Sequence, residues 1–318
     1  MYLKFTYGPN FSLTRWDWRD DISCYFDTDN NLTSIADMNP AGRSIFFNDP
    51  TCNMRLWDPK DSCVIESAAR AHWNWEVYVL FNNPISKEEM NDNDALKVLM
   101  KIPNVKFARV NIEEYSMGTP AEGFVSSGAL NDTACPIMLT EGLVKYLTLY
   151  KFGGIFMEKD IIVTKSLSSL PRNWVPKQNE FSIGSGILAL SKNGRSISES
   201  ALRLLVKNHK NLDCENGENV MEKIVDQQCS TPDPLTKAAA SCNGFEIYGP
   251  QFFYPIPSEK AGEVFEPGEL PGYETAYTYY LWSKLSIGAR FMKRNGSRYG
   301  KLAKKHCPIV YSSFTYKF

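Results

Sequence analysis

The sequence predicts an α/β protein in which a mostly parallel sheet is flanked by helices. Short apolar runs alternate with helical patterns in residues 44–110, as expected when parallel strands are joined by crossover helices. A second indication is the order of residues 137–163, where an amphipathic segment, two glycines and a short apolar run follow one another. Both observations favour one large domain with a substantial core.

The first part of the chain supplies the elements of this alternation. Residues 44–48 form the first predicted strand, which an Asp-Pro pair closes. Residues 62–72 place two aliphatic residues and two alanines on one helical face. The continuous apolar run 77–81 ends at Asn-Asn-Pro, as a buried parallel strand would. A capping box at its start predicts a helix over 86–101, and the next strand is expected at 105–110.

The most informative segment is the one that ends in two acidic residues. Leucines and tyrosines at helical spacing predict a helix over 137–151, and the glycine pair that follows ends it. The strand 155–157 comes next, and then Glu158 and Asp160. In open α/β sheets, ligands bind at the carboxyl ends of the strands, so both acids are expected at the ligand-binding edge.

The remaining elements are less regular. We predict a strand over 181–190, a helix over 196–210 and an aromatic, proline-bound loop at 252–257. Residues 1–43 are read as an irregular tail or stem, and residues 44–318 as a single domain.

Charge and cysteine content narrow the classes of function. The net charge is -1 and like charges form no block, which argues against nucleic-acid binding and electrostatic membrane docking. We expect a soluble chain, or a fragment without its N-terminal anchor, since no run approaches the ~20 apolar residues of a membrane span. Eight cysteines fit a lumenal or secreted protein with disulfides, although buried free thiols are an alternative. We predict a bridge between Cys229 and Cys242.

The two acids have two possible interpretations. Residues separated by one other residue on an extended strand project to the same face, so Glu158 and Asp160 can converge while Lys159 points away. Carboxylate oxygens suit Mg²⁺ or Mn²⁺, and such an ion would neutralise a diphosphate. The alternative is a pair of solvated charges at a strand end, and the residues alone leave both interpretations open.

Six further motifs occur along the chain. They are CVIESAAR at 63–70, YKFGGIF at 150–156, IIV at 161–163, FFYPIP at 252–257, YTYYLWS at 277–283 and HCP at 306–308. In their order and spacing they resemble the α-1,4-glycosyltransferase family typified by lactosylceramide 4-α-galactosyltransferase, with the α-1,4-N-acetylglucosaminyltransferases as relatives. The resemblance covers roughly residues 44–310.

The resemblance implies a nucleotide-sugar-binding fold of the GT-A type and a retaining transfer of galactose or an N-acetylhexosamine. The donor would be a UDP-sugar, the cofactor Mn²⁺ or Mg²⁺, and the acceptor a glycolipid or glycoprotein glycan in α-1,4 linkage. It also implies a type II membrane protein on the lumenal face of the Golgi that takes part in glycosphingolipid biosynthesis.

The resemblance also suggests site residues. Glu158 and Asp160 are the predicted metal ligands, and no catalytic residue can be named. Donor contacts are predicted at five positions, which are Asn48, Asp49, Lys145, Gly184 and Ser185.

The chain departs from the family pattern at several of these places. Glu158 stands where the family has aspartate, Lys145 where it has arginine and Tyr280 where it has histidine. Further departures are Glu141 and Gly142 in the donor helix, Gly184-Ser185, and the segment 215–219. These changes motivate an alternative function, a non-catalytic homologue that binds a glycan or a partner transferase.

Overall fold

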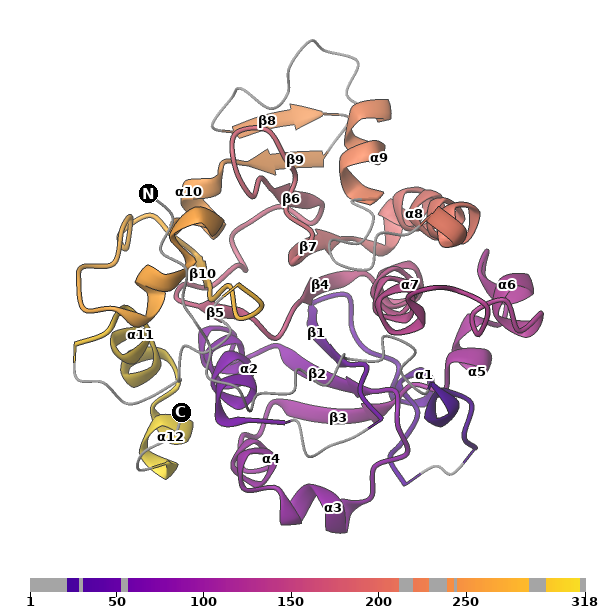
Figure 1. Cartoon of the computed structure of the whole chain (residues 1–318), viewed down its shortest axis with the longest axis horizontal. Coiled ribbons are helices and arrows are strands. Elements are labelled where there is room, and N and C mark those ends of the chain that lie inside the picture. The colour runs from indigo at the N-terminus through magenta and orange to yellow at the C-terminus, as the bar shows by residue number, and fades with distance from the viewer. Residues whose placement is uncertain are drawn as a thin grey trace, which may run out of the picture.

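The computed structural model describes residues 22–28, 31–52, 57–211, 220–228, 239–242, 245–285 and 296–314. Within these ranges an eight-stranded sheet has the order β3-β2-β1-β4-β7-β6-β9-β8, and β5 and β10 form a separate antiparallel pair (Figure 1). Strands β3, β2, β1 and β4 are mutually parallel, β7 is antiparallel to β4 and β6, and β9 is parallel to β6. The predicted α/β class is therefore confirmed.

The strands have the following bounds: β1 Ser44–Asp49, β2 Glu76–Phe81, β3 Val105–Arg109, β4 Gly154–Met157, β5 Ile161–Val163, β6 Trp174–Pro176, β7 Ile187–Leu190, β8 Ala239–Cys242, β9 Phe245–Tyr248 and β10 Thr278–Tyr280. The α-helices are α1 Ile35–Met38, α2 Pro59–Ala71, α3 Lys87–Asp92, α4 Asp94–Leu99, α5 Ile112–Ser116, α6 Glu122–Ser126, α7 Pro136–Lys151, α8 Arg195–Asn208, α9 Val220–Gln228, α10 Pro250–Phe253, α11 Arg298–His306 and α12 Pro308–Ser313. Short 3-10 helices are Ser23–Tyr25, Lys192–Gly194, His209–Asn211 and Ser258–Phe265.

Two hydrophobic cores lie on opposite faces of the sheet. Because side chains alternate along a strand, Ile45 and Phe47 of β1 join the core under α2, α4 and α11. Phe46, between them, joins the core under α7 and α8. Figure 1 shows α2 and α7 on either side of β1 and β4. Helices on both faces thus leave the carboxyl ends of β1 and β4 accessible between α2 and α7.

The predicted helix over 86–101 is wrong in one respect, because it is two helices. Ser86 and Glu89 form the expected capping box at the start of α3. Asn93 then adopts an extended conformation, and its side chain accepts hydrogen bonds from the backbone N–H groups of Ala95 and Leu96. An asparagine that caps a second helix therefore interrupts the apolar periodicity.

Two predictions for the later part of the chain also need correction. The strand expected over 181–190 is limited to β7, since the backbone before Ile187 makes only isolated contacts such as the bridge between Lys177 and Ile183. Gly184 allows a close approach here, because a Cβ atom in its place would lie 2.7 Å from the Tyr254 ring. The expected loop at 252–257 begins inside the short helix α10, which Pro250 starts.

The described part of the N-terminal segment packs against the domain. Tyr25 and Ile35 are fully buried, and a disulfide joins Cys24 to Cys52. Residues 1–21 lie outside the described ranges, so the extent of the predicted tail or stem stays a prediction.

Disulfides are present in this protein. Cys63 of α2 is bonded to Cys307 at the start of α12, and Cys135 is also disulfide-bonded. The five cysteines whose side chains are described, Cys24, Cys52, Cys63, Cys135 and Cys307, are all bonded, so the free-thiol alternative is wrong for them. Cys229 lies outside the described residues, so the Cys229–Cys242 bridge stays a prediction. None of the helices described above combines the length and apolar character that crossing a membrane requires.

Candidate functional site

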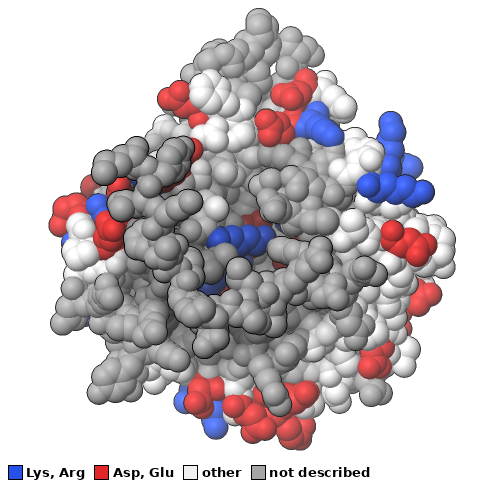
Figure 2. All heavy atoms as spheres, viewed as in Figure 1, with Lys and Arg blue, Asp and Glu red and all other residues white. Residues whose placement is uncertain are grey.

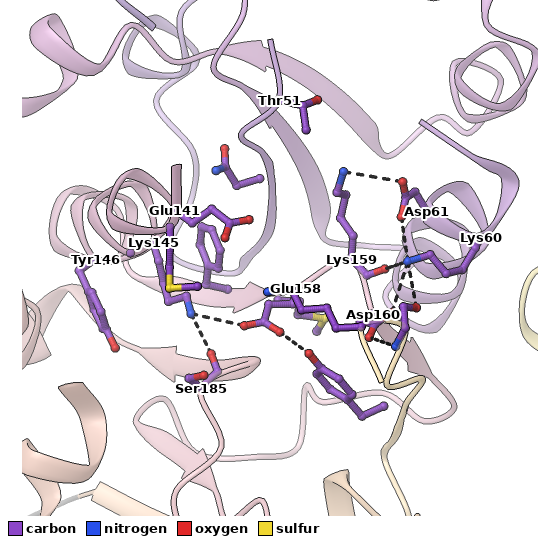
Figure 3. A pocket seen from close by; sticks show the side chains of 18 of the residues that line it. Thr51, Lys60, Asp61, Glu141, Lys145, Tyr146, Glu158, Lys159, Asp160 and Ser185 are labelled. Carbon is purple, nitrogen blue, oxygen red and sulfur yellow. Dashed lines mark hydrogen bonds and ion pairs between the residues drawn. The ribbon is translucent and has the colours of Figure 1, made fainter. Parts of the chain in front are cut away.

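A pocket of about 400 Å³ lies at the carboxyl ends of β1 and β4, between α7, the first turn of α2 and the loop after β10. Figure 3 shows its polar side chains pointing inward from these elements. In Figure 2, lysine and acidic atoms are visible within a hollow near the centre of the molecule. The lining residues are Asn48, Thr51, Lys60, Asp61, Met138, Glu141, Gly142, Lys145, Tyr146, Phe156, Met157, Glu158, Lys159, Asp160, Ser185, Leu205, Tyr280, Ser283 and Lys284.

Glu158 follows the last residue of β4 and makes two contacts in the pocket. Its Oε2 accepts a hydrogen bond of 2.6 Å from the Tyr280 hydroxyl. Its Oε1 lies 3.8 Å from Nζ of Lys145, which also donates to the Ser185 carbonyl at 2.9 Å. Burial and the Glu158 carboxylate raise the pKa of Tyr280 well above its ordinary value, so this phenol stays a donor at neutral pH.

Asp160 is more enclosed than Glu158 and points toward α2. Its Oδ2 accepts a hydrogen bond from the backbone N–H of Ser283 at 2.8 Å. Its Oδ1 accepts from the Ser283 hydroxyl and from Nζ of Lys60, the latter at 3.3 Å. The side chain of Asp160 is 12% exposed, against 37% for Glu158.

Lys159 lies between the two acids in sequence, and its side chain contacts other acids, Asp49 and Asp61. Its Nζ is 3.0 Å from Asp49 and 3.7 Å from Asp61, and lies over the Trp57 ring, 4.6 Å from the centroid. Burial acts to lower the pKa of Lys159, but Asp49 and Asp61 outweigh it and raise this pKa above its ordinary value. The ammonium therefore stays charged in the folded protein.

The expectation that Glu158 and Asp160 lie on an extended strand is wrong. Strand β4 ends at Met157, and Lys159 and Asp160 form a turn before β5, so the three residues are not an extended strand. Both acids line one pocket, but each has different partners. The predicted strand ends where β4 ends, but strand geometry was applied beyond it, to residues 158–160, where the chain turns.

Two further polar side chains belong to the pocket. Asn48, at the end of β1, is 7% exposed, and neither polar atom of its amide has a hydrogen-bond partner. Glu141 of α7 has a pKa raised above its ordinary value by burial; Lys284 opposes this shift and Glu158 adds to it. A buried amide without partners is costly, so Asn48 is poised to bond a ligand.

Of the predicted donor residues, Asn48, Lys145 and Ser185 line the pocket. The other two, Asp49 and Gly184, are not among the lining residues. Asp49 accepts hydrogen bonds from Lys159 and Thr51, and Gly184 lies against Tyr254. Their roles as donor contacts, like the metal roles of the two acids, stay predictions.

Sequence reasoning missed Lys60 and Asp61. Both belong to the first turn of α2, the helix that follows β1. A crossover helix starts at the carboxyl end of the strand before it, so its first turn lies at the same edge as the strand ends. That rule, applied to residues 59–61, would have found them.

We tested whether these residues fit a divalent metal ion. Oxygen ligands of Mg²⁺ lie at ~2.0–2.1 Å, whereas Lys60 already occupies one side of Asp160, and Tyr280 and Lys145 contact Glu158. In the described part of the chain, no group of three or more His, Cys, Asp or Glu side chains could hold a metal ion. As arranged, the two acids do not fit one.

Two protein-family models match consecutive parts of the chain. Residues 58–181 match a glycosyltransferase sugar-binding region containing a DXD motif, and residues 190–314 match an alpha 1,4-glycosyltransferase conserved region. The first match includes both acids of the pocket.

Curated relatives agree with these matches. Lactosylceramide 4-alpha-galactosyltransferase of Homo sapiens is 26% identical over 79% of this chain and 72% of the relative. Alpha-1,4-N-acetylglucosaminyltransferase of Homo sapiens is 22% identical over 79% of the chain and 74% of the relative. The resemblance predicted from the sequence is thus confirmed: the chain is similar to alpha-1,4-glycosyltransferases.

Solved glycosyltransferase structures are also similar, at a low level. The galactosyltransferase LgtC in complex with donor and acceptor sugar analogs is 16% identical, with a TM-score of 0.44 over 86% of this chain and 96% of that one. The PaToxG glycosyltransferase is 15% identical, with a TM-score of 0.46 over 59% of this chain and 69% of that one.

Proposed function

We propose that this protein is a retaining glycosyltransferase that uses a UDP-sugar. It moves galactose or an N-acetylhexosamine to a terminal sugar of a glycolipid or glycoprotein glycan, in α-1,4 linkage. The observation that carries the proposal is the lysine-lined pocket of about 400 Å³ at the carboxyl edge of the sheet. Its position is where open α/β sheets bind ligands, and its size is in the usual range of ~300–1,000 Å³ for small-molecule sites.

The side chains of the pocket fit the parts of such a donor. The unpartnered amide of Asn48 offers one donor and one acceptor group to the base or the ribose. Lys145 presents a cation to the diphosphate, as a point charge and not as a bidentate fork. In a front-face transfer, which the family resemblance implies, the donor's own phosphate takes the acceptor proton, so no protein nucleophile is required.

The proposal extends to location. Five described cysteines are disulfide-bonded, which fits the oxidising lumen in which such bonds persist; they are Cys24, Cys52, Cys63, Cys135 and Cys307. We propose the lumenal face of the Golgi membrane as its location. The predicted Mn²⁺ or Mg²⁺ stays a prediction, and no step proposed here depends on it.

The test is release of UDP by the purified chain. The protein is incubated with UDP-galactose, UDP-GalNAc or UDP-GlcNAc and a lactoside acceptor, in parallel with Mn²⁺ and with EDTA. One donor should give UDP release that depends on the acceptor, and the product should retain the anomeric configuration.

Variants make this test specific. Lys145→Ala should lower kcat/KM by about tenfold to a hundredfold, since a charge-assisted hydrogen bond contributes ~1.5–3 kcal/mol. Lys101→Ala, an exposed lysine beyond α4, is the matched control. If no donor binds or reacts at millimolar concentration, the proposal is wrong. Binding of UDP without any transfer would instead favour the non-catalytic homologue.

A further inference from the structure

We propose that this site binds the donor's diphosphate without a divalent metal ion, because the ammonium group of Lys60 occupies the cation position beside Asp160. The inference rests on the proposed function, since it concerns the same UDP-sugar pocket. In this proposal, the positive charge beside the acids of the pocket comes from a side chain of the protein and not from a metal ion.

The ammonium of Lys60 lies within a cage of four oxygen atoms (Figure 3). Its Nζ is 3.2 Å from Oδ1 of Asp61, 3.3 Å from Oδ1 of Asp160, 3.3 Å from Oγ of Ser283 and 3.4 Å from the carbonyl oxygen of Lys159. Two carboxylates, one hydroxyl and one carbonyl are the ligand types that a hard cation prefers. The side chain of Lys60 is 12% exposed, so its charge is largely shielded from water.

A metal ion would have to displace this ammonium to reach Asp160. Both oxygens of Asp160 are engaged, Oδ2 by the Ser283 N–H and Oδ1 by the Ser283 hydroxyl and Lys60. Removing one partner of a buried ion pair leaves an uncompensated charge, which is strongly unfavourable. An added divalent ion that left Lys60 in place would meet a like charge at a few ångströms in a poorly solvated site.

The second acid does not restore a metal site. Glu158 is turned toward Tyr280 and Lys145, away from Lys60 (Figure 3). The described charged side chains of the pocket wall balance in sign. They are four lysines, Lys60, Lys145, Lys159 and Lys284, and four acids, Asp61, Glu141, Glu158 and Asp160.

This balance favours an anionic ligand over a free cation. Lys284 is exposed, and Lys145 is only loosely paired, at 3.8 Å from Glu158. Lys60 and Lys159 are fixed by close carboxylates, so Lys145 and Lys284 are the cations available to a diphosphate. The diphosphate of a UDP-sugar carries two negative charges, and these two lysines can balance them.

The first experiment measures UDP binding by the full chain. Isothermal titration calorimetry with UDP is carried out in EDTA and again with saturating Mn²⁺. The two dissociation constants should agree within about threefold, which is less than the effect of one ordinary contact. A gain of about tenfold or more with Mn²⁺ overturns the inference but leaves the proposed function standing. Absence of UDP binding in both conditions refutes both.

The second experiment needs no nucleotide. Binding of Mn²⁺ alone is followed by the loss of the electron paramagnetic resonance signal of the free ion. The unaltered protein should bind Mn²⁺ no tighter than about 1 mM. Lys60→Ala vacates the cage and removes the ammonium that lies beside both Asp61 and Asp160, so the variant should bind Mn²⁺ at least about tenfold more tightly.

Two variants control for charge and folding. Lys60→Arg keeps the charge and should leave Mn²⁺ binding weak, and Lys101→Ala removes a lysine far from the pocket. Circular dichroism confirms that each variant is folded. Tight Mn²⁺ binding by the unaltered protein, or no gain in folded Lys60→Ala, would show that Lys60 does not take the place of a metal ion.

Discussion

Lys159 makes a prediction about stability that can be worked from its contacts. Replacing it with methionine keeps an apolar stem against Trp57 but removes the ammonium that lies 3.0 Å from Asp49 and 3.7 Å from Asp61. Breaking a buried pair by removing one partner costs about 3–5 kcal/mol. Asp61 keeps Lys60, at 3.2 Å, so the uncompensated charge is mainly that of Asp49.

The expected magnitude lies at the low end of that range. Oδ1 of Asp49 still accepts hydrogen bonds from the N–H and hydroxyl of Thr51, at 2.9 and 2.7 Å. The ammonium's contact with the Trp57 ring, worth about 1 kcal/mol, is lost as well. We therefore expect Lys159→Met to lower the free energy of unfolding by about 3 kcal/mol.

Urea denaturation with the disulfides intact, followed by tryptophan fluorescence, measures this loss. Lys159→Arg keeps the charge and should cost less than about 1 kcal/mol. In an Asp49→Asn background, Lys159→Met should lower the free energy of unfolding by at least about 1 kcal/mol less, because the main partner of Lys159 is already neutral there. A loss under about 0.5 kcal/mol, or an equal loss in both backgrounds, would refute this account of the buried cluster.

Three other predictions concern the scaffold. Glu66→Ala leaves two backbone N–H groups at the start of α12 without their acceptor and should cost about 2–4 kcal/mol in chemical denaturation, with Glu66→Gln costing less. Gly153→Ala should lower the free energy of unfolding by at least about 2 kcal/mol, because the added Cβ would lie 2.6 Å from a backbone nitrogen. Gly118 has nearly the same φ but lies in open space, so Gly118→Ala should cost about 1 kcal/mol. Equal losses in the two variants would contradict the steric argument. His72 is buried, and its Nε2 accepts a hydrogen bond from the Leu167 N–H. Burial lowers the pKa of His72 in the folded protein, so below about pH 6.5 the unfolded chain binds a proton that the folded chain does not. The free energy of unfolding should therefore fall as the pH drops below that value. His72→Gln should flatten that slope in unfolding measurements between pH 8 and pH 5.

The parallel half of the fold could be predicted because its signals are local. The strands β1 and β2 contain the continuous apolar runs 45–47 and 77–81, and α7 ends at a glycine pair with positive φ values, which other residues rarely adopt. The antiparallel half could not be predicted as well. Its strands β6 and β7 are only three and four residues long, and their pairing depends on contacts distant in sequence.

The position of the candidate site was predictable, but its side-chain contacts were not. Strand periodicity placed Glu158 and Asp160 at the carboxyl edge, and both line the pocket. Their directions depend on a turn at Lys159 and on partners far away in sequence. Ser283 lies 123 residues from Asp160, and Lys60 lies 100 residues from it.

Three of the positions at which the resemblance suggests a departure from the family pattern contact one another. Glu158 accepts a hydrogen bond from Tyr280 and pairs with Lys145, and all three are departures. A glutamate reaches about 1.5 Å further than an aspartate, one bond length, and that reach brings its carboxylate to both partners. Tyrosine donates a hydrogen bond to a carboxylate, where a neutral histidine nitrogen could ligate a metal ion. If the site had simply lost its function, the three residues would not be expected to change into a set that bonds to one another. These contacts therefore favour a pocket in which side chains of the protein balance the charge of the acids in place of a metal ion.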